Sequence, residues 1–258
     1  MRLTGNTMFI TGGTSGIGRA LAEQFHRRGN QVIIAGRRQE RLDEITAANP
    51  GMRGMQLDIE DPASIDRVAA EVRRQFPELN VLINNAGIQK PQDLTADDPK
   101  ILGALSVIQT NIVGTLLLTA ALLPALTQQR DAMILTTSSG LAFVPRNNFP
   151  IYCASKAFLH SWLQSLRFQL RKTSVQVLEL APPYVKTELK GADEGHAMPL
   201  DEFIAEVMEL LADPAPPRGE ILVDRVKPLR FAEWNHDYEQ KFALLNPEAA
   251  RDWAAPLS

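Results

Sequence analysis

The sequence predicts an α/β fold, a doubly wound parallel sheet of about seven strands with helices on both faces. Short apolar runs alternate with longer amphipathic stretches, the pattern of βα units. The first run passes directly into a glycine-rich turn, TGGTSGIG at residues 11–18. With 258 residues, 45% of them hydrophobic, the chain can bury one large core. We therefore expect a single domain over residues 1–258, with a tail from about residue 224.

The predicted strands are seven apolar runs, as expected for strands covered on both faces of a parallel sheet. In chain order they are Met8–Thr11, Val32–Ala35, Met55–Asp58, Val81–Asn84, Ala132–Ser138, Val175–Leu180 and Ile221–Val223. The amphipathic stretches between them predict helices at Ile17–Arg28, Gln39–Ala48, Ala63–Phe76, Lys100–Gln128, Tyr152–Lys172 and Leu200–Leu211. A kink is expected at Pro124, because proline cannot donate the helical hydrogen bond.

After Val223 the pattern loosens, and we expect one more helix near Tyr238–Leu245. Trp234 and Trp253 lie beside it. Aromatic side chains in a terminal segment are expected to pin the tail to its own domain, and contact with a partner subunit is the alternative.

Composition argues against several classes of partner. The formal net charge of −3 gives no basic surface for nucleic acid or an anionic membrane. No apolar run is expected to reach the roughly eighteen residues of a membrane helix. The single cysteine, Cys153, excludes an internal disulfide, and the polar start of the chain does not resemble a signal peptide, so a cytoplasmic location is expected. No metal site is expected, because His26, His160, His196 and His236 lack ligand spacing.

The glycine-rich turn lies between the first strand and the first helix, where a Rossmann-type fold binds a dinucleotide pyrophosphate. Gly12 allows the tight turn, Gly16 lets the backbone approach phosphate, and Gly18 permits close packing. The following helix offers free N–H groups to the anion. Taken alone, three glycines could also simply ease a turn.

Tyr152 and Lys156 are four residues apart on a predicted helix, thirteen residues after Ser139. Positions i and i+4 share one helix face, so the Lys156 ammonium is expected to favour the ionised Tyr152 phenol and lower its pKa from about 10. The phenol then becomes usable as an acid or base near neutrality. The alternative is an ordinary pair on an exposed helix face.

These motifs occur in a telling order: the glycine-rich turn, Asp58, NNAG at 84–87, Asn111, Ser139, Tyr152 with Lys156, and Thr187. Together they resemble the short-chain dehydrogenase/reductase family over about residues 6–223. The glycine spacing is similar to that of the compact single-domain branch, and less like that of nucleotide-sugar epimerases and dehydratases.

The resemblance implies a nicotinamide cofactor. Its pyrophosphate would lie on the turn formed by Gly12, Thr14, Ser15, Gly16, Ile17 and Gly18. Asp58 and Ile59 would contact adenine, while Asn85, Ala86 and Gly87 would line the ribose side of the groove. Thr187, with the backbone at Pro182 and Val185, would hold the carboxamide. Pro183 departs from the glycine usual in the family and lacks a backbone N–H.

The resemblance also implies catalytic roles. Ser139 would hydrogen-bond the substrate carbonyl, Tyr152 would protonate it, and Lys156 would also bind the nicotinamide ribose. Asn111 would hold a water that links Lys156 to solvent. Ser138 is the alternative to Ser139, but the spacing to Tyr152 favours Ser139.

The end of the second predicted strand indicates NADP(H) in preference to NAD(H). NAD sites place an acidic residue there, and this chain has Gly36 followed by Arg37 and Arg38. A guanidinium can grip the 2′-phosphate. Two solvated arginines at a helix start are the alternative.

We therefore expect an NADP-dependent oxidoreductase acting on a small to medium carbonyl compound or secondary alcohol, and a homodimer paired through its two longest helices. A catalytically silent NADP-binding sensor or scaffold is the alternative. Candidate substrate contacts are Gln89, Lys90, Leu141, Phe143, Asn147, Phe149, Tyr184 and the segment 188–199.

Overall fold

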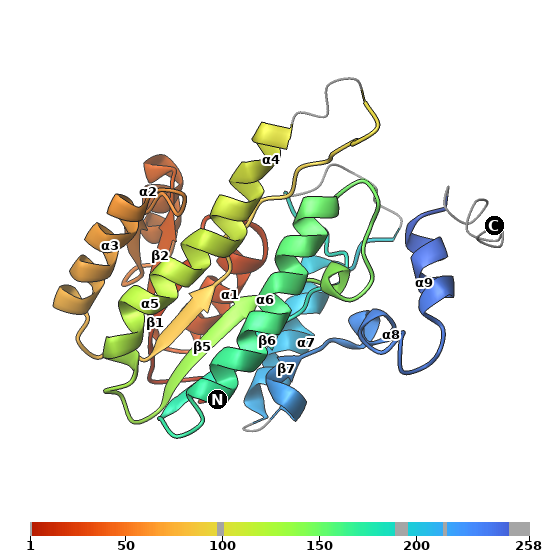
Figure 1. Ribbon diagram of the computed structural model, residues 1–258. Helices are drawn as coiled ribbons and strands as arrows, with labels where there is room; N and C mark the ends of the chain where they lie inside the picture. Colours follow the sequence, from red (N-terminus) through yellow and green to blue (C-terminus); the bar gives the residue numbers. More distant parts are fainter. Residues whose placement is uncertain (1, 97–100, 189–195, 214–215, 248–258) are drawn as a thin grey trace, which may run out of the picture.

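A seven-stranded parallel sheet forms the centre of the protein, in the order β3-β2-β1-β4-β5-β6-β7. The computed structural model describes residues 2–96, 101–188, 196–213 and 216–247 (Figure 1). The strands are β1 Thr7–Thr11, β2 Gln31–Gly36, β3 Arg53–Gln56, β4 Val81–Asn84, β5 Ala132–Thr137, β6 Val175–Leu180 and β7 Glu220–Ile221. The order reverses between β1 and β4, which is where open α/β sheets bind ligands. The predicted fold class is confirmed.

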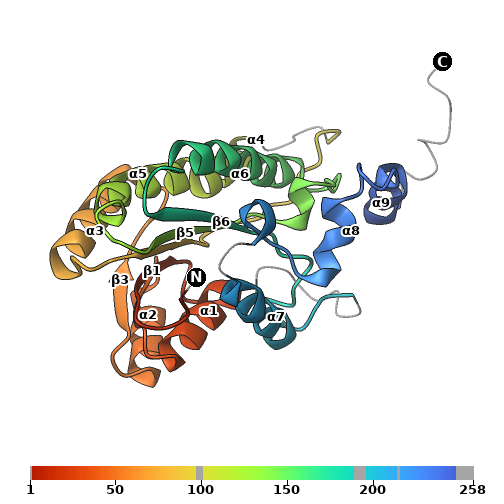
Figure 2. The same ribbon diagram turned by 90° about the horizontal axis from the view of Figure 1, so that it is seen from below.

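Helices cover both faces of the sheet (Figure 2). One face carries α3 Pro62–Gln75, α4 Ile101–Ile108, α5 Thr115–Leu126 and α6 Pro150–Gln169. The other carries α1 Gly16–Arg27, α2 Gln39–Ala48 and α7 Leu200–Ala212, and the tail forms α8 Lys227–Arg230 and α9 Tyr238–Leu245.

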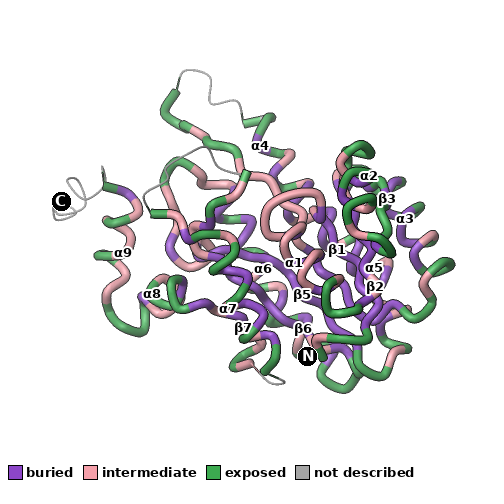
Figure 3. The backbone as a smooth tube through the Cα atoms, turned by 180° about the vertical axis from the view of Figure 1, so that it is seen from behind, coloured by how far each residue is buried: buried purple, intermediate pink, exposed green. Residues whose placement is uncertain are grey.

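Each face of the sheet has its own hydrophobic core. Alternate residues of a strand point to opposite faces, so Met8 and Ile10 pack with α1 and α7 while Phe9 packs with α3, α5 and α6. The strands are buried along their whole length in the middle of the sheet (Figure 3). This double burial explains the unbroken apolar runs of the sequence.

β3 and β7 end two residues before their predicted ends, whereas β1, β2 and β5 differ from the predicted bounds by one residue at one or both ends. β3 begins and ends two residues before the predicted Met55–Asp58, because it is an edge strand in which only Met55 is buried and the apolar signal is weak. β7 is Glu220–Ile221 instead of Ile221–Val223, since its pairing with β6 stops at Ile221.

The predicted long helix at 100–128 is interrupted in its middle. A π-helical turn, Gln109–Gly114, separates α4 from α5. Such turns are frequent at functional sites. Here Gly114 packs directly on the Ile59 carbonyl, where any Cβ would collide. The helix continues through Pro124 and ends at Leu126, so the marked irregularity lies ten residues before the proline.

By length and composition alone, Gly103–Leu126 could span a membrane, and 44% of its most apolar 18-residue window is buried here. The expectation that no apolar run is long enough is therefore wrong. One such helix is weak evidence for a membrane, because a core helix passes the same test.

The tail is anchored by an asparagine. Helix α9 has the predicted bounds, and Asn246 at its end is 1% exposed. Its Oδ1 accepts a bond of 2.7 Å from the Asn147 N–H, and its Nδ2 donates to the Pro145 carbonyl at 3.1 Å. Trp234 stays 62% exposed, although the Arg218 guanidinium lies 4.2 Å from its ring centroid. Trp253 lies outside the described residues.

Candidate active site

The sequence motifs meet at the carboxyl edge of the sheet, beside the reversal of strand order. Thr11, the last residue of β1, ties two of them together. Its Oγ1 accepts the N–H groups of Asn85 and Ala86 at 3.0 and 3.1 Å, and the Asn85 amide donates to the Thr11 carbonyl at 3.3 Å. The glycine-rich turn and the turn after β4 are thereby fixed as one unit.

The glycine-rich turn has the backbone that its sequence predicts. Gly12 and Gly16 have φ values of +64° and +52°, in the left-handed region. A Cβ on Gly18 would collide with the Gly12 carbonyl and the Asn85 amide, so this glycine serves packing within the site.

The start of α1 fits a dinucleotide pyrophosphate. Ser15 is its N-cap and makes no side-chain capping bond, which leaves the first-turn N–H groups for another acceptor. A Cβ on Gly16 would lie 3.4 Å from Thr187, so the loop after β6 faces this turn closely.

The end of β2 is closely packed around Gly36. A Cβ on Gly36 would lie 2.9 Å from the Thr14 methyl group. Arg37 follows with its side chain 61% exposed, 3.9 Å from a Glu60 oxygen. Such a weak, exposed pair leaves the guanidinium available to a phosphate. Arg38 is the N-cap of α2 and is exposed as well.

Asp58 and Ile59 lie in the loop after β3, beyond the strand that was expected to include Asp58. The exposed Asp58 accepts the Glu60 N–H at 3.0 Å, which orders the loop. Ile59 is buried against the π-helical turn.

That turn carries Asn111, which is fully buried. Its Oδ1 accepts the Ile88 N–H at 2.9 Å, and its Nδ2 donates to the Ile88 carbonyl at 3.1 Å and to Ser155 Oγ at 3.0 Å. A Cβ on Gly87 would lie 3.3 Å from Asn111 Oδ1 and 3.5 Å from Lys156 Nζ. Asn111 therefore holds the segment after β4 against the lysine.

Ser139, Tyr152 and Lys156 come together, all of them buried. The Ser139 hydroxyl hydrogen-bonds the Tyr152 phenol and accepts the Leu141 N–H at 3.1 Å. Lys156 Nζ lies 5.7 Å from the Tyr152 ring centroid and donates to the Thr137 carbonyl at 2.8 Å. The neighbouring Ser138 faces away, since it donates to Glu179 at 2.5 Å.

Burial dominates the titration of the pair. It raises the pKa of Tyr152 to about 12, against the opposing effect of the Ser139 hydrogen bond, and lowers the pKa of Lys156 to about 8. The expectation that Lys156 brings the pKa of the phenol toward neutrality is therefore not met in this arrangement. The physical reason is that both groups are removed from water, while the ammonium is engaged with the Thr137 carbonyl.

Tyr152 belongs to a small apolar cluster with Val107 and Cys153. Ile88, Leu141, Phe149 and Ile151 pack against this cluster. Both amide atoms of Gln89 are buried there in the chain segment after Ile88, without a hydrogen-bond partner among the described residues. Of the other candidate substrate contacts, those at 189–195 lie outside the described residues.

The loop after β6 carries the residues expected to hold the carboxamide. The Pro182 carbonyl accepts the Gly140 N–H at 2.8 Å, and Val185 pairs with Met198 across the base of this loop.

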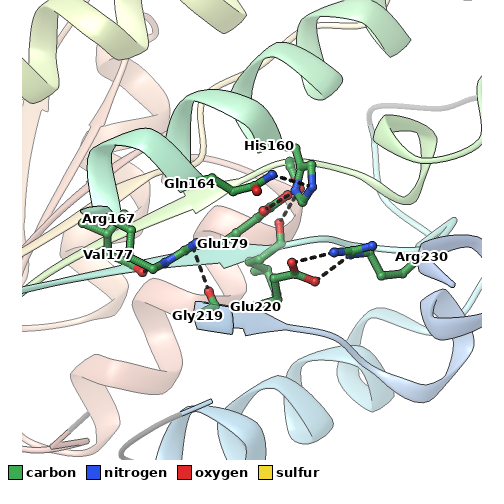
Figure 4. A network of polar contacts seen from close by, with 10 residues as sticks. His160, Gln164, Arg167, Val177, Glu179, Gly219, Glu220 and Arg230 are labelled. Atoms are coloured by element: carbon green, nitrogen blue, oxygen red, sulfur yellow. Dashed lines mark hydrogen bonds and ion pairs between the residues drawn. The ribbon is translucent and has the colours of Figure 1, made fainter. Parts of the chain in front are cut away.

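Sequence reasoning missed a buried polar network beneath the site, formed by His160, Glu179, Glu220 and Arg230 (Figure 4). Its one signal was a glutamate inside the apolar strand 175–180.

Comparison with known proteins follows the same lines. A family model described as short chain dehydrogenase matches residues 6–196. The uncharacterized oxidoreductase DltE of Bacillus subtilis (strain 168) is 37% identical over 254 residues, 96% of this chain and 99% of that protein.

Two solved structures are similar as well. A short chain dehydrogenase from Burkholderia cenocepacia J2315 in complex with NADP has a TM-score of 0.81 at 25% identity, over 95% of this chain and 99% of that one. A 3-ketoacyl-(acyl-carrier-protein) reductase from Brucella melitensis complexed with NADH has a TM-score of 0.75 at 26% identity, over 83% and 93%. The two complexes hold different nicotinamide cofactors, so the choice between them rests on this chain's own residues.

Proposed function

The chain belongs to the short-chain dehydrogenase family, and we propose that it is an NADP(H)-dependent oxidoreductase for a small to medium carbonyl compound or secondary alcohol. Membership supports an oxidoreductase with a nicotinamide cofactor. The observation that carries the catalytic proposal is the buried group of Ser139, Tyr152 and Lys156 beside the glycine-rich turn.

The cofactor would supply the hydride, and the chain's own residues would bind and orient the cofactor. The N–H groups at the start of α1 would hold the pyrophosphate, and Arg37 the 2′-phosphate. Lys156 would donate to the nicotinamide ribose, on the side that Gly87 leaves open by having no side chain. Thr187 faces the same turn and would hold the carboxamide.

Tyr152 would give its proton to the carbonyl oxygen while Ser139 donates a hydrogen bond to that oxygen. A phenol with a pKa of about 12 is fully protonated at neutral pH, yet it is a far stronger acid than the alcohol being formed. This favours the reductive direction. Alcohol oxidation would require the phenolate, which a cation close to the phenolic oxygen would stabilise.

The apolar cluster that includes Tyr152 suits an apolar group next to the carbonyl. Ile88, Leu141, Phe149 and Ile151 would bury it, at about 25 cal/mol per Å² of apolar surface removed from water. We therefore propose a moderately hydrophobic ketone or aldehyde.

We also propose a homodimer paired through α4, α5 and α6. These helices expose large apolar side chains, among them Leu105 at 48%, Leu117 at 39% and Phe158 at 41%. Light scattering at micromolar concentration is expected to give twice the chain mass. A monomer under those conditions contradicts the pairing.

A panel of ketones and aldehydes tests the function, with NADPH consumption as the readout. Oxidation of NADPH by at least one moderately apolar carbonyl compound is expected. The alternative of a silent sensor or scaffold predicts NADPH binding with no turnover on any compound, and an epimerase predicts turnover of nucleotide sugars.

A further inference from the structure

Glu179 is a carboxylate in a place that normally excludes one. It lies in β6 at 0% exposure, between apolar neighbours. Burying a carboxylate costs several kcal/mol unless hydrogen bonds and opposite charges compensate it. The groups that compensate Glu179 therefore indicate its role in the protein.

The first partner links Glu179 to the active site. Ser138 Oγ donates to Glu179 Oε1 at 2.5 Å, and the Ser138 N–H donates to the Leu180 carbonyl at 2.8 Å. Ser138 directly precedes Ser139, whose hydroxyl bonds the Tyr152 phenol. The short bond fixes the chain immediately before this hydroxyl.

The second partner comes from the helix that carries the reactive pair. His160 Nδ1 lies 2.8 Å from Glu179 Oε2, and His160 Nε2 lies 3.0 Å from the Gln164 amide (Figure 4). Tyr152, Lys156, His160 and Gln164 follow one another at intervals of four along α6, so they share a side of the helix. These four side chains form a polar row along α6, which passes Glu179 at His160 and reaches the surface at Gln164.

The cluster is an ion-pair network already satisfied by protein groups. Ligand atoms of His160, Glu179 and Glu220 lie within 4.8 Å of one another, as a metal site would require. Both Glu220 oxygens, however, accept bonds from Arg230, at 2.7 and 2.9 Å. The Arg230 guanidinium therefore supplies the positive charge that a metal ion would otherwise bring to Glu220.

The charged and titratable groups near Glu179 come from three other elements. Lys156, His160 and Arg167 belong to α6, Glu220 to β7 and Arg230 to α8. Of these, Lys156 belongs to the reactive pair of the active site.

We propose that Glu179 is a positioning residue of the active site, which fixes the Ser138–Ser139 strand end and supplies the buried negative charge that compensates the Lys156 ammonium. The proposal rests on the proposed function for its catalytic meaning. Attraction by Glu179 raises the pKa of Lys156 against burial, which lowers it to about 8. Without that charge, Lys156 loses its proton at a lower pH.

Glu179→Gln separates charge from shape, because the amide oxygen can still accept the Ser138 hydroxyl. The ionisation of Lys156 is followed by NMR in protein labelled with ¹³Cε-lysine, and the signal is assigned by its loss in Lys156→Arg. We expect the titration midpoint to fall by about one pH unit, which corresponds to about 1.4 kcal/mol of lost attraction. Glu220→Gln is the matched control, because Glu220 is also buried, at 7% exposure in the neighbouring strand β7, and it is expected to keep the wild-type midpoint.

This titration needs no substrate, so it stands even if the protein proves to have no turnover. An unchanged midpoint in Glu179→Gln, or an equal fall in Glu220→Gln, overturns the electrostatic half of the proposal.

Ser138→Ala tests the positioning half and serves as the deciding variant if Glu179→Gln does not fold. It keeps the charge and removes the short bond. We expect kcat to fall about tenfold with KM for the carbonyl compound within about twofold and an unchanged Lys156 midpoint, and Ser138→Thr to restore kcat. A wild-type kcat in Ser138→Ala overturns the proposal.

Discussion

The two halves of the sheet build their share of the site by different means. On the side of β1 to β4, the site is mostly backbone: glycines at Gly12, Gly16 and Gly18, and strand ends joined through Thr11. On the side of β5 to β7, it consists of buried reactive and charged side chains, held by hydrogen bonds such as Ser138 to Glu179 and Asn147 to Asn246. The first half can be inferred from a short motif, whereas the second depends on contacts between distant parts of the chain.

Lys156 is where the two halves meet, and its removal is expected to have the largest effect. Nζ lies beside Gly87 from the first half and bonds Thr137 from the second. Lys156→Ala is expected to lower kcat by about 10²-fold or more and to weaken NADPH binding about tenfold, because the ammonium would serve both the phenol and the ribose.

Lys172→Ala, an exposed lysine past the end of the same helix, is the control. Steady-state kinetics and fluorescence titration of NADPH measure the two effects. Equal NADPH affinity in Lys156→Ala and wild type would refute the role of Lys156 in binding the ribose. The lysine would then serve only the half of the site that contains Tyr152.

Arg37 tests the first half alone. Arg37→Ala is expected to weaken NADPH binding by about 10- to 30-fold, the value of a charge-assisted hydrogen bond of about 1.5–2 kcal/mol, and to leave NADH binding unchanged. Replacing Gly36 by Asp is a poorer test, since its Cβ would lie 2.9 Å from the Thr14 methyl group. Arg41→Ala is the control, since this half-exposed arginine of α2 already pairs with Glu44. Equal loss of both cofactors in Arg37→Ala contradicts a role in selecting the 2′-phosphate.

Asn246 tests the second half alone, with the smallest expected effect. Its amide joins the tail to the chain at Pro145 and Asn147, just before α6 and Tyr152. Asn246→Ala is expected to raise KM for the carbonyl compound several-fold and to lower the free energy of unfolding by about 1–3 kcal/mol, because buried backbone groups lose their partner. NADPH affinity is expected to stay unchanged.

Leu244→Ala, at 75% exposure on α9, is the matched control for Asn246→Ala. Steady-state kinetics measures KM, and denaturant unfolding measures the free energy of unfolding of both variants. A loss of NADPH affinity in Asn246→Ala would show that the tail also supports the first half of the site.

The two halves of the site also differ in how well the sequence predicts them. The alternation of apolar runs gives the sheet, and the glycine spacing gives the turn at Gly12 to Gly18, because both signals are local. The edge strand β3 was placed two residues late, since only Met55 in it is buried. The π-helical turn at Gln109–Gly114 has no local signal, because it arises from packing of Gly114 on Ile59.

Side-chain networks were the least predictable part. The partners of Glu179 are 41 residues before it, at Ser138, and 19 residues before it, at His160. The raised pKa of Tyr152 follows from its depth of burial, which the spacing to Lys156 does not reveal. Sequence motifs thus single out the candidate reactive residues, while the ionisation of these residues depends on the surrounding fold.

The most direct test of the central claim is a single-turnover comparison of wild type and Tyr152→Phe, each loaded with NADPH and mixed with the best carbonyl compound from the panel. Phenylalanine keeps the buried ring and removes the phenolic hydroxyl, and with it the proton that is to be transferred. We expect NADPH oxidation to slow by about 10²- to 10⁴-fold while NADPH affinity changes by no more than a few-fold. An undiminished rate in Tyr152→Phe would contradict the claim that this phenol supplies the proton.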